Sequence, residues 1–271
     1  MPRLLAAALA SALVAGTVPA HASGNVVTAV VFGAVRIAGD IDANAIRLYP
    51  GPDPGSLALE AMDGTTTIDG TAGPVVLSAV TAGVHIDLGG GDDELVVEDA
   101  ELPAALEILG GDGADRITLD DCHVHGGTRI AGGGAGDQIA LGTTTFDGKL
   151  AVQSDSGDDV VSLDLVNVAQ RTKLSTGLGN DQLSIIDSSL LASDVVITTA
   201  SGADTLTFDD ATIDGRLHVA LGDGDDTMTT HATVCGDRVN LNGGGGTDTT
   251  TDAGGNAFAR GVDVRKFEVI Q

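Results

Sequence analysis

Apolar residues recur along most of this chain with two spacings, one within short segments and one between them. Within a segment they alternate with polar or small residues, and this period of two predicts β-strands with a single buried face. Between segments, one aliphatic position returns every 22 residues, with one interval of 23. Its eight members are Ile86, Ile108, Ile130, Val152, Leu174, Ile197, Val219 and Leu241.

An aspartate that closes a glycine-rich turn repeats on the same interval, seven residues after each of these aliphatic positions. The eight aspartates are Asp93, Asp115, Asp137, Asp159, Asp181, Asp204, Asp226 and Asp248. Further apolar positions follow two, four and nine residues after the aspartate in most repeats, as Leu95, Val97 and Leu102 do in the first. A coil of this kind cannot bury its inward face alone, so repeats must stack into a continuous core. The pattern therefore predicts an all-β fold, a parallel β-solenoid of the β-helix or β-roll type.

Both ends of the chain carry a weaker form of the repeat. Asn44 occupies the aspartate position of one degenerate coil, and Thr66 follows 22 residues later, before an excess of five residues that predicts a bulged loop at 74–83. Val262 begins a last, incomplete coil. We therefore expect about ten 22-residue coils, with residues 23–83 forming degenerate coils and a cap and residues 84–271 the regular solenoid.

Composition narrows the classes of partner. The 271 residues include 39 glycines, 39 acidic and only 13 basic residues, for a net charge of −26. Such a chain attracts cations and disfavours nucleic acid and anionic lipid. Residues 1–22 have the basic start, apolar stretch and small-residue cleavage pattern of a secretory signal peptide. No later segment is apolar enough to span a membrane, so we expect a secreted protein, extracellular, periplasmic or at the cell surface.

The turn itself has the form G-G-x-G-x-D-x-U-x, in which U is a large apolar residue. Residues 110–118 match it at every position, and the turns ending at Asp93, Asp181 and Asp226 lack only the first glycine. The turn at Asp248 matches through the aspartate and then has a threonine in place of the apolar residue. This sequence resembles the hemolysin-type calcium-binding repeat, known as RTX.

The resemblance implies calcium bound between stacked turns, through aspartate carboxylates and backbone carbonyls. Seven gaps between eight turns imply up to about seven Ca²⁺ ions, in one row because each 22-residue coil holds one such turn. The turn at Asp137 lacks the third glycine. The turns at Asp159 and Asp204 keep only that glycine and the aspartate, so we expect the turns at Asp159 and Asp204 to bind least. Besides the eight aspartates, the expected metal-site residues are Gly89, Gly91, Gly111, Gly113, Gly177, Gly179, Gly222, Gly224, Gly244 and Gly246.

Three other groups of residues have candidate chemistry. A basic stripe, Lys149, Arg171, Arg216 and Arg238, would suit an acidic polysaccharide, although its columns contain no aromatic residue of the kind that sugar-binding surfaces use. Cys122, His123 and His125 are metal-ligand types, but no second cluster stands at ligand spacing, which disfavours zinc. Outward T-x-T pairs at 205–207, 227–229 and 249–251 resemble ice-binding solenoids, and threonine also simply suits exposed strands.

The sequence thus predicts a secreted calcium-binding repeat protein without catalytic residues, a structural or adhesive module of the extracellular surface. The alternative is a β-helix polysaccharide lyase or epimerase acting on acidic polysaccharide. The two cysteines, Cys122 and Cys235, lie five repeats apart and are predicted to be unpaired despite the oxidising compartment.

Overall fold

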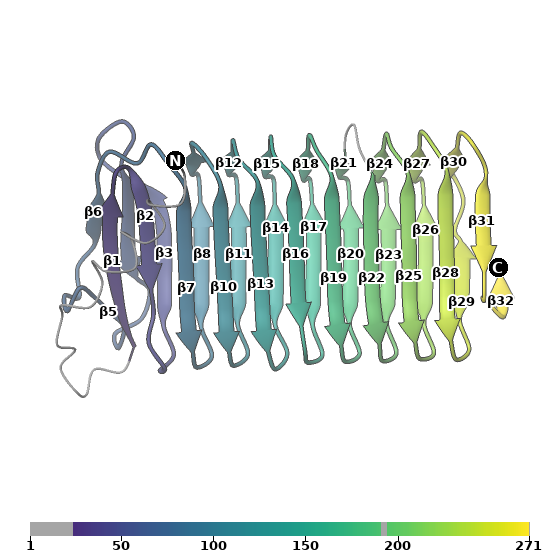
Figure 1. The fold of residues 1–271 in the computed structure, drawn as a ribbon, viewed down its shortest axis with the longest axis horizontal. Helices are drawn as coiled ribbons and strands as arrows, with labels where there is room; N and C mark the ends of the chain where they lie inside the picture. Colours follow the sequence, from purple (N-terminus) through teal and green to yellow (C-terminus); the bar gives the residue numbers. More distant parts are fainter. Residues whose placement is uncertain (1–23, 191–193, 271) are drawn as a thin grey trace, which may run out of the picture.

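The chain folds as a rod of stacked β-coils, as the period of two and the 22-residue repeat predict (Figure 1). The computed structural model describes residues 24–190 and 194–270, and the predicted signal peptide at 1–22 lies outside these residues. Within the described part of the chain there is no helix, and therefore none that is long and apolar enough to cross a membrane.

Each regular coil contains a long strand, the Gly-Asp turn, a five-residue strand, a corner and a two-residue strand. The long strands are β7 (Val84–Gly90), β10 (Leu106–Asp112), β13 (Thr128–Gly134), β16 (Leu150–Asp155), β19 (Thr172–Leu178), β22 (Val195–Ser201), β25 (Leu217–Asp223), β28 (Val239–Gly245) and the shorter β31 (Val262–Arg265). The second face is made of β8 (Glu94–Glu98), β11 (Arg116–Asp120), β14 (Gln138–Gly142), β17 (Val160–Asp164), β20 (Gln182–Ile186), β23 (Thr205–Asp209), β26 (Thr227–His231), β29 (Thr249–Asp252) and β32 (Val269–Ile270). The third is made of β9 (Glu101–Leu102), β12 (His123–Val124), β15 (Thr145–Phe146), β18 (Asn167–Val168), β21 (Ser189–Leu190), β24 (Thr212–Ile213), β27 (Val234–Cys235) and β30 (Ala257–Phe258).

Like strands of successive coils pair in parallel, so the rod has three sheets and one core between them. The pairing is residue for residue at the predicted interval: Ile108 lies between Ile86 and Ile130, and Ile117 between Leu95 and Ile139. Stacking like on like fills the core with ladders of aliphatic side chains that are almost all fully buried. The parallel β-solenoid predicted from the sequence is confirmed.

The number of coils is lower than predicted. The described residues form eight complete coils, from β7 to β30, with β31 and β32 beginning another. The degenerate coil at Asn44 supplies β2 (Ala34–Ala38) and β3 (Ala45–Pro50), which pair in parallel with β7 and β8. The estimate of about ten coils is wrong because the segment around Thr66 does not continue the stack.

That segment instead folds back across the end of the rod. The strands involved are β1 (Asn25–Val31), β4 (Leu57–Ala61), β5 (Thr67–Ile68) and β6 (Val75–Leu77). β4 pairs antiparallel with β3, Leu59 opposite Leu48, and β6 pairs antiparallel with β4. The turn between Pro50 and Leu57 makes this hairpin. The expected bulged loop at 74–83 is therefore not an insertion into a coil but the end of a cap that covers the first coil.

Candidate metal centre

The eight repeated aspartates lie at the turn between the long strand and the five-residue strand of each coil. All of them are at most 2% exposed, although each is an ionisable residue beside a surface turn. Stacking aligns them along the rod, and we call this row the aspartate ladder: Asp93, Asp115, Asp137, Asp159, Asp181, Asp204, Asp226 and Asp248.

One carboxylate oxygen of each aspartate connects two coils. Oδ1 accepts a hydrogen bond from the backbone N–H of the aspartate in the preceding coil, at 2.7–3.1 Å throughout the ladder. The first aspartate, Asp93, accepts in the same way from the N–H of Asn44, at 2.6 Å. At the other end, the N–H of Asp248 donates to Oε2 of Glu268, also at 2.6 Å. Asn44 and Glu268 thus complete the two ends of the ladder, and Glu268 was missed at the sequence level because it lies outside the repeat.

The other carboxylate oxygen has no protein partner. Oδ2 is buried and without a hydrogen bond in every one of the eight aspartates. Buried polar atoms are rarely left unsatisfied, and a buried unpaired carboxylate is especially costly. A whole row of such atoms therefore calls for a proton or a cation on Oδ2.

The electrostatic consequence is a raised pKa in the ladder. Burial, which disfavours the charged carboxylate, raises the pKa of Asp93 and Asp137 from 3.8 to about 7. The same cause raises the pKa of Asp115, Asp159 and Asp226 to about 6. Neighbouring acids in the ladder add to the effect in Asp93, Asp137 and Asp226. At neutral pH these carboxyls are therefore close to their titration range when no cation is bound.

The surroundings of Oδ2 differ between coils, according to the residue five positions before the aspartate. Where that residue is glycine, oxygen atoms lie close to it on the side where a side chain would stand. A Cβ atom on Gly110 would lie 2.3 Å from Oδ2 of Asp115 and 2.4 Å from the carbonyl oxygen of Gly132 in the next coil. A Cβ on Gly243 would similarly meet Oδ2 of Asp248 and the carbonyl of Lys266. In these coils a carboxylate oxygen and a carbonyl oxygen thus lie near each other with no side chain between them, and hard cations prefer oxygen ligands of both kinds.

The turns at Asp159, Asp181 and Asp204 have a hydroxyl side chain at that position, and those at Asp93 and Asp226 have leucine. Ser154 donates to the carbonyl of Thr176 at 3.0 Å, and Thr199 donates to the carbonyl of Leu221. At Asp159 and Asp204 the next carbonyl therefore already has a donor, so one oxygen fewer is free to bind a cation. Weaker binding by these two turns stays a prediction.

Every glycine predicted for the metal site has a structural reason of its own. Each lies four or two residues before an aspartate and has a positive φ, between 98° and 145°. The coils also approach closely here: a Cβ on Gly111 would lie 2.0 Å from the carbonyl oxygen of Gly89, and one on Gly113 would lie 2.1 Å from that of Gly91. Glycine suits these positions whether or not a cation binds, although Ala135, Asp155 and Ala200 take the equivalent positions of other coils with a smaller positive φ of 67° to 76°.

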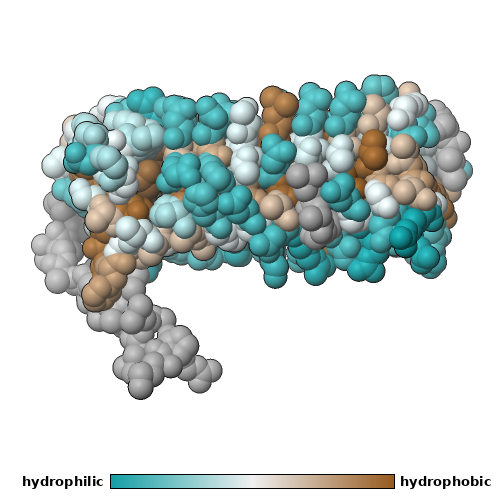
Figure 2. Space-filling view, turned by 90° about the horizontal axis from the view of Figure 1, so that it is seen from above, coloured by the Kyte–Doolittle hydropathy of each residue, from teal (hydrophilic) through white to brown (hydrophobic). Residues whose placement is uncertain are grey.

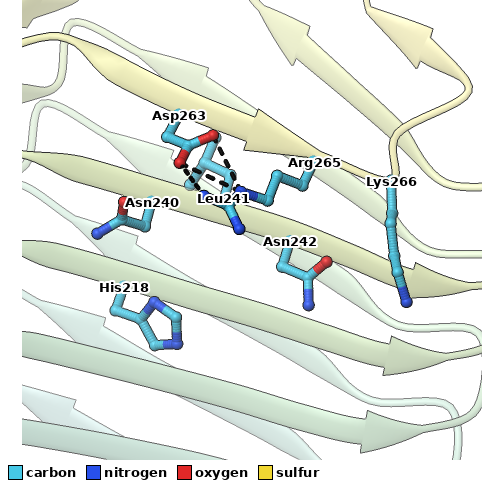
Figure 3. Close-up of a pocket in the computed structure, with 7 residues that line it drawn as sticks. All are labelled: His218, Asn240, Leu241, Asn242, Asp263, Arg265 and Lys266. Atoms are coloured by element: carbon cyan, nitrogen blue, oxygen red, sulfur yellow. Dashed lines mark hydrogen bonds and ion pairs between the residues drawn. The ribbon is translucent and has the colours of Figure 1, made fainter.

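The basic stripe of Lys149, Arg171, Arg216 and Arg238 includes one residue that is already paired with an acid. Arg216 is paired with Asp194 at 2.5 Å. Near its end lies a shallow hollow of about 440 Å³ between β25, β28 and β31 (Figure 3). Its one carboxylate, Asp263, is hydrogen-bonded to Arg265 at 2.6 Å, and none of the residues that line it is Phe, Tyr or Trp. The visible face of the rod in Figure 2 is largely hydrophilic, with hydrophobic residues scattered rather than gathered in one patch.

The two cysteines are free and buried, as predicted. Cys235 lies in the apolar column of the third sheet, where it is the register partner of Ile213. Cys122 faces inward, with its thiol directed at the carbonyls of Val97 and Asp120. It is therefore turned away from His123 and His125 and cannot complete a metal site with them.

No protein-family model, curated protein or solved structure matches this chain. The resemblance to the hemolysin-type repeat therefore rests on the turn sequence, and functional reasoning rests on the geometry of the chain itself.

Proposed function

We propose that this protein is a secreted, calcium-stabilised rod that serves as a structural or adhesive module outside the cell. The observation that carries the proposal is the row of eight buried Oδ2 atoms without partners. Aspartates stacked about 5 Å apart repel one another by about 3 kcal/mol per neighbouring pair at an effective dielectric near 20, before screening by solvent. Cations along the ladder would remove both this repulsion and the cost of the unpaired oxygens.

Calcium suits the ladder better than the other common cations. The available donors are carboxylate and carbonyl oxygens, and Ca²⁺ accepts six to eight such ligands in a flexible arrangement, whereas Mg²⁺ demands a regular octahedron. The coils with glycine five positions before the aspartate have no side chain between these oxygens. The residues that would hold the ion are the ladder aspartates, with backbone carbonyls such as that of Gly132.

A second way to satisfy Oδ2 is a proton, and Asn44 shows what that would look like. Asn44 occupies the aspartate position, and its Nδ2 donates to the carbonyl of Asp42 at 2.7 Å and, over longer distances, to Oδ1 of Asp93 at 3.2 Å and the carbonyl of Leu88 in the next coil at 3.4 Å. A protonated Asp115 would have the corresponding carbonyl of Gly132 as its acceptor. Calcium is favoured at neutral pH because at least three of the ladder pKa values lie near 6, which leaves those carboxyls mostly ionised in the absence of a cation.

The proposal of a non-enzymatic role rests on what the outer faces offer. Regular coils expose repeating rows rather than a cleft, and the hollow near β31 holds a single carboxylate already paired with arginine. The alternative, a polysaccharide lyase or epimerase, would need an acid and a base grouped around a bound sugar. An assay for uronate cleavage in the presence of calcium separates the two, and sustained turnover would favour the enzyme.

Calcium titration by calorimetry tests whether the ladder aspartates bind the ion. It is carried out at pH 7.5 on the wild type, Asp115→Asn and Asp159→Asn. Asparagine keeps the Oδ1 acceptor and can donate to the next carbonyl, as Asn44 does, so the rod should stay folded. We expect Asp115→Asn to bind fewer ions than Asp159→Asn, because Ser154 already donates to the carbonyl of Thr176, whereas Gly110 has no side chain. Glu94→Gln, an exposed neutralisation on β8, is the control and should leave binding unchanged. Equal calcium binding by all four proteins would overturn the assignment.

A further inference from the structure

A second cluster of ligand-type side chains lies on the opposite edge of the coil from the aspartate ladder. Strand β12 and its neighbours alternate, so Cys122 and Val124 point into the core while His123 and His125 point out. Stacking adds a carboxylate from the coil on each side. Glu101 is the register partner of His123, and Asp147 begins the turn after β15 in the following coil.

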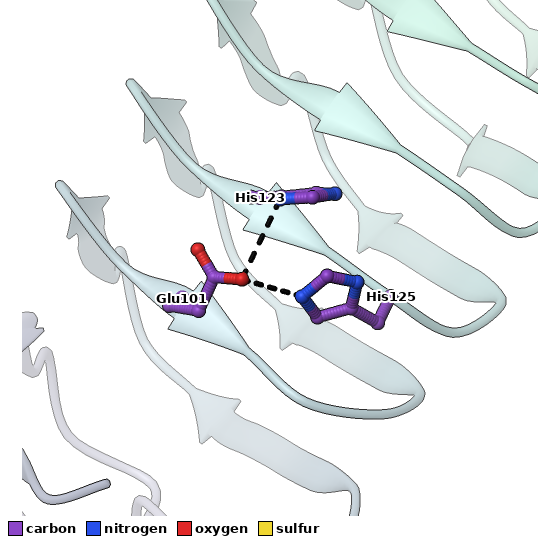
Figure 4. A group of neighbouring side chains, drawn as sticks. All are labelled: Glu101, His123 and His125. Atoms are coloured by element: carbon purple, nitrogen blue, oxygen red, sulfur yellow. Dashed lines mark hydrogen bonds and ion pairs between the residues drawn. The ribbon is translucent and has the colours of Figure 1, made fainter. Parts of the chain in front are cut away.

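Three ligand atoms converge on one side of the two imidazoles (Figure 4). Oε1 of Glu101 lies 3.5 Å from Nδ1 of His123 and is hydrogen-bonded to Nε2 of His125. One atom from each of these three residues falls within 4.8 Å of the other two. Ligands about 2.0–2.2 Å from a tetrahedral zinc ion stand about 3.3 Å apart, so only small side-chain movements would place all three around one ion.

Asp147 contacts the two imidazoles from the other side. Its Oδ2 lies 3.1 Å from Nε2 of His123 and 2.7 Å from Nδ1 of His125. Oδ2 of Asp147 accepts a hydrogen bond from Nδ1 of His125, and Oε1 of Glu101 accepts one from Nε2. A metal ion bound to Nε2 of His125 would therefore replace the proton that this nitrogen donates, and Asp147 would keep its contact with Nδ1. Metal-binding histidines commonly have such a carboxylate behind them, because it fixes the tautomer and the orientation of the ring.

We propose that Glu101, His123 and His125 bind a divalent transition metal, Zn²⁺ in the first instance, with Asp147 as the positioning residue. Two imidazole ligands select zinc, nickel or copper over calcium, which prefers oxygen. The side chains of His123 and His125 are 36% and 39% exposed, so a fourth position would be open to water or to a ligand from outside. This site does not depend on calcium in the aspartate ladder.

Other histidines of the described coils lack one or more of these features. His231 lies with Asp209 and Asp210 but has no second imidazole beside it. His85 is paired with Glu107 at 3.0 Å, again as a single imidazole. His85→Gln therefore supplies a matched control, a substitution of a half-exposed, carboxylate-paired histidine elsewhere on the rod.

The test is zinc titration by calorimetry of the full chain, purified without a polyhistidine tag and saturated with calcium to occupy oxygen sites. We expect one tight site in the wild type and in His85→Gln, and loss of that site in His123→Gln and His125→Gln. Asp147→Asn should keep the stoichiometry and weaken binding by about 10–100-fold, as expected of an outer-shell carboxylate. Cobalt in place of zinc should give the visible absorption of a tetrahedral ion and lose it in His125→Gln.

Failure of the wild type to bind zinc would overturn the proposal. So would zinc binding that His123→Gln and His125→Gln leave intact, because the ion would then lie elsewhere. In either case His123 and His125 serve only as ion-pair partners of Glu101 and Asp147.

Discussion

Oδ1 of Asp137 accepts a hydrogen bond of 2.8 Å from the backbone N–H of Asp115, and this contact repeats along the rod. Each aspartate thus satisfies a buried donor of the preceding coil, while its second oxygen remains without a protein partner. The ladder therefore has two separable roles. Oδ1 supports the stacking of coils, and Oδ2 creates the demand for a cation or a proton.

Two different substitutions of one ladder aspartate, Asp137, separate these roles. Asp137→Ala leaves the N–H of Asp115 buried without an acceptor, and we expect a loss of about 1–3 kcal/mol in the free energy of unfolding. Asp137→Asn keeps the acceptor and removes the charge, so in calcium-free buffer at pH 8 it should be at least as stable as the wild type. Urea denaturation of the three proteins measures this. Equal destabilisation by alanine and asparagine would contradict the role of Oδ1.

Without calcium, stability should fall as the pH rises. Five ladder carboxyls, those of Asp93, Asp115, Asp137, Asp159 and Asp226, have folded pKa values of about 6 to 7, raised by burial from 3.8. A raised carboxyl pKa means that the folded state binds protons more tightly, so this stabilisation is complete below about pH 4 and is lost as the pH passes through 6 to 7. Thermal melts of calcium-free protein should therefore show a higher Tm at pH 5 than at pH 8. A higher Tm at pH 8 would mean that the ladder carboxyls are not buried as described.

Gly113, two positions before Asp115, should not tolerate a side chain at its own φ, whereas Ala135 takes the equivalent position of the next coil with a φ of +67°. Gly113 has φ of +124°, and a Cβ there would lie 2.1 Å from the carbonyl oxygen of Gly91. We expect Gly113→Ala to cost on the order of 1–3 kcal/mol from the backbone conformation alone, with the clash in addition. Gly64→Ala, at a position with open space around it, is the control and should change stability by less than about 1 kcal/mol. A neutral Gly113→Ala would show that the coils do not stack this closely.

Both thiols should be protected in the folded rod and free in the unfolded chain. Cys122 and Cys235 are buried and unpaired, and burial raises the pKa of the Cys122 thiol to about 11. A thiol reagent at pH 8 should react slowly with native protein and count two thiols per chain after denaturation without reductant. A count of zero in the denatured monomer would indicate a disulfide and contradict the register of the coils.

The regular part of the rod could be predicted from sequence because each core column repeats one chemical type. Core columns of mixed residue type could not be predicted in this way. The position seven residues after the aspartate is buried in every complete coil except the last, where it is Gly255, yet it holds Ala100, Cys122 and Thr144 in succession. The corner before it, where Asp99 and Asp121 have positive φ, was also not predicted. Polar residues are accepted inside because their hydroxyls hydrogen-bond to neighbouring backbone, as Thr144 does to the carbonyl of Gly142.

The cap could not be predicted in the same way, because antiparallel and parallel pairing bury the same apolar positions. Leu57 and Leu59 fit a further coil equally well, and only the proline-rich turn before them distinguishes a hairpin. The histidine cluster could not be predicted for a different reason. Its carboxylates are far from His123 and His125 in sequence, and the 22-residue register brings Glu101 and Asp147 to them from adjacent coils.

If calcium satisfies the aspartate ladder, it must stabilise the folded rod against heat at pH 8, where the ladder carboxyls repel one another. Melts are recorded after chelation, with excess calcium, and with magnesium at the same concentration. Binding restricted to the folded state raises stability by mass action, by about 2.7 kcal/mol for each site at a free ion concentration 100 times its Kd. We predict a large increase in Tm with calcium, little with magnesium, and loss of the pH dependence once calcium is present. The same Tm in chelator and in calcium would show that calcium does not bind the aspartate ladder.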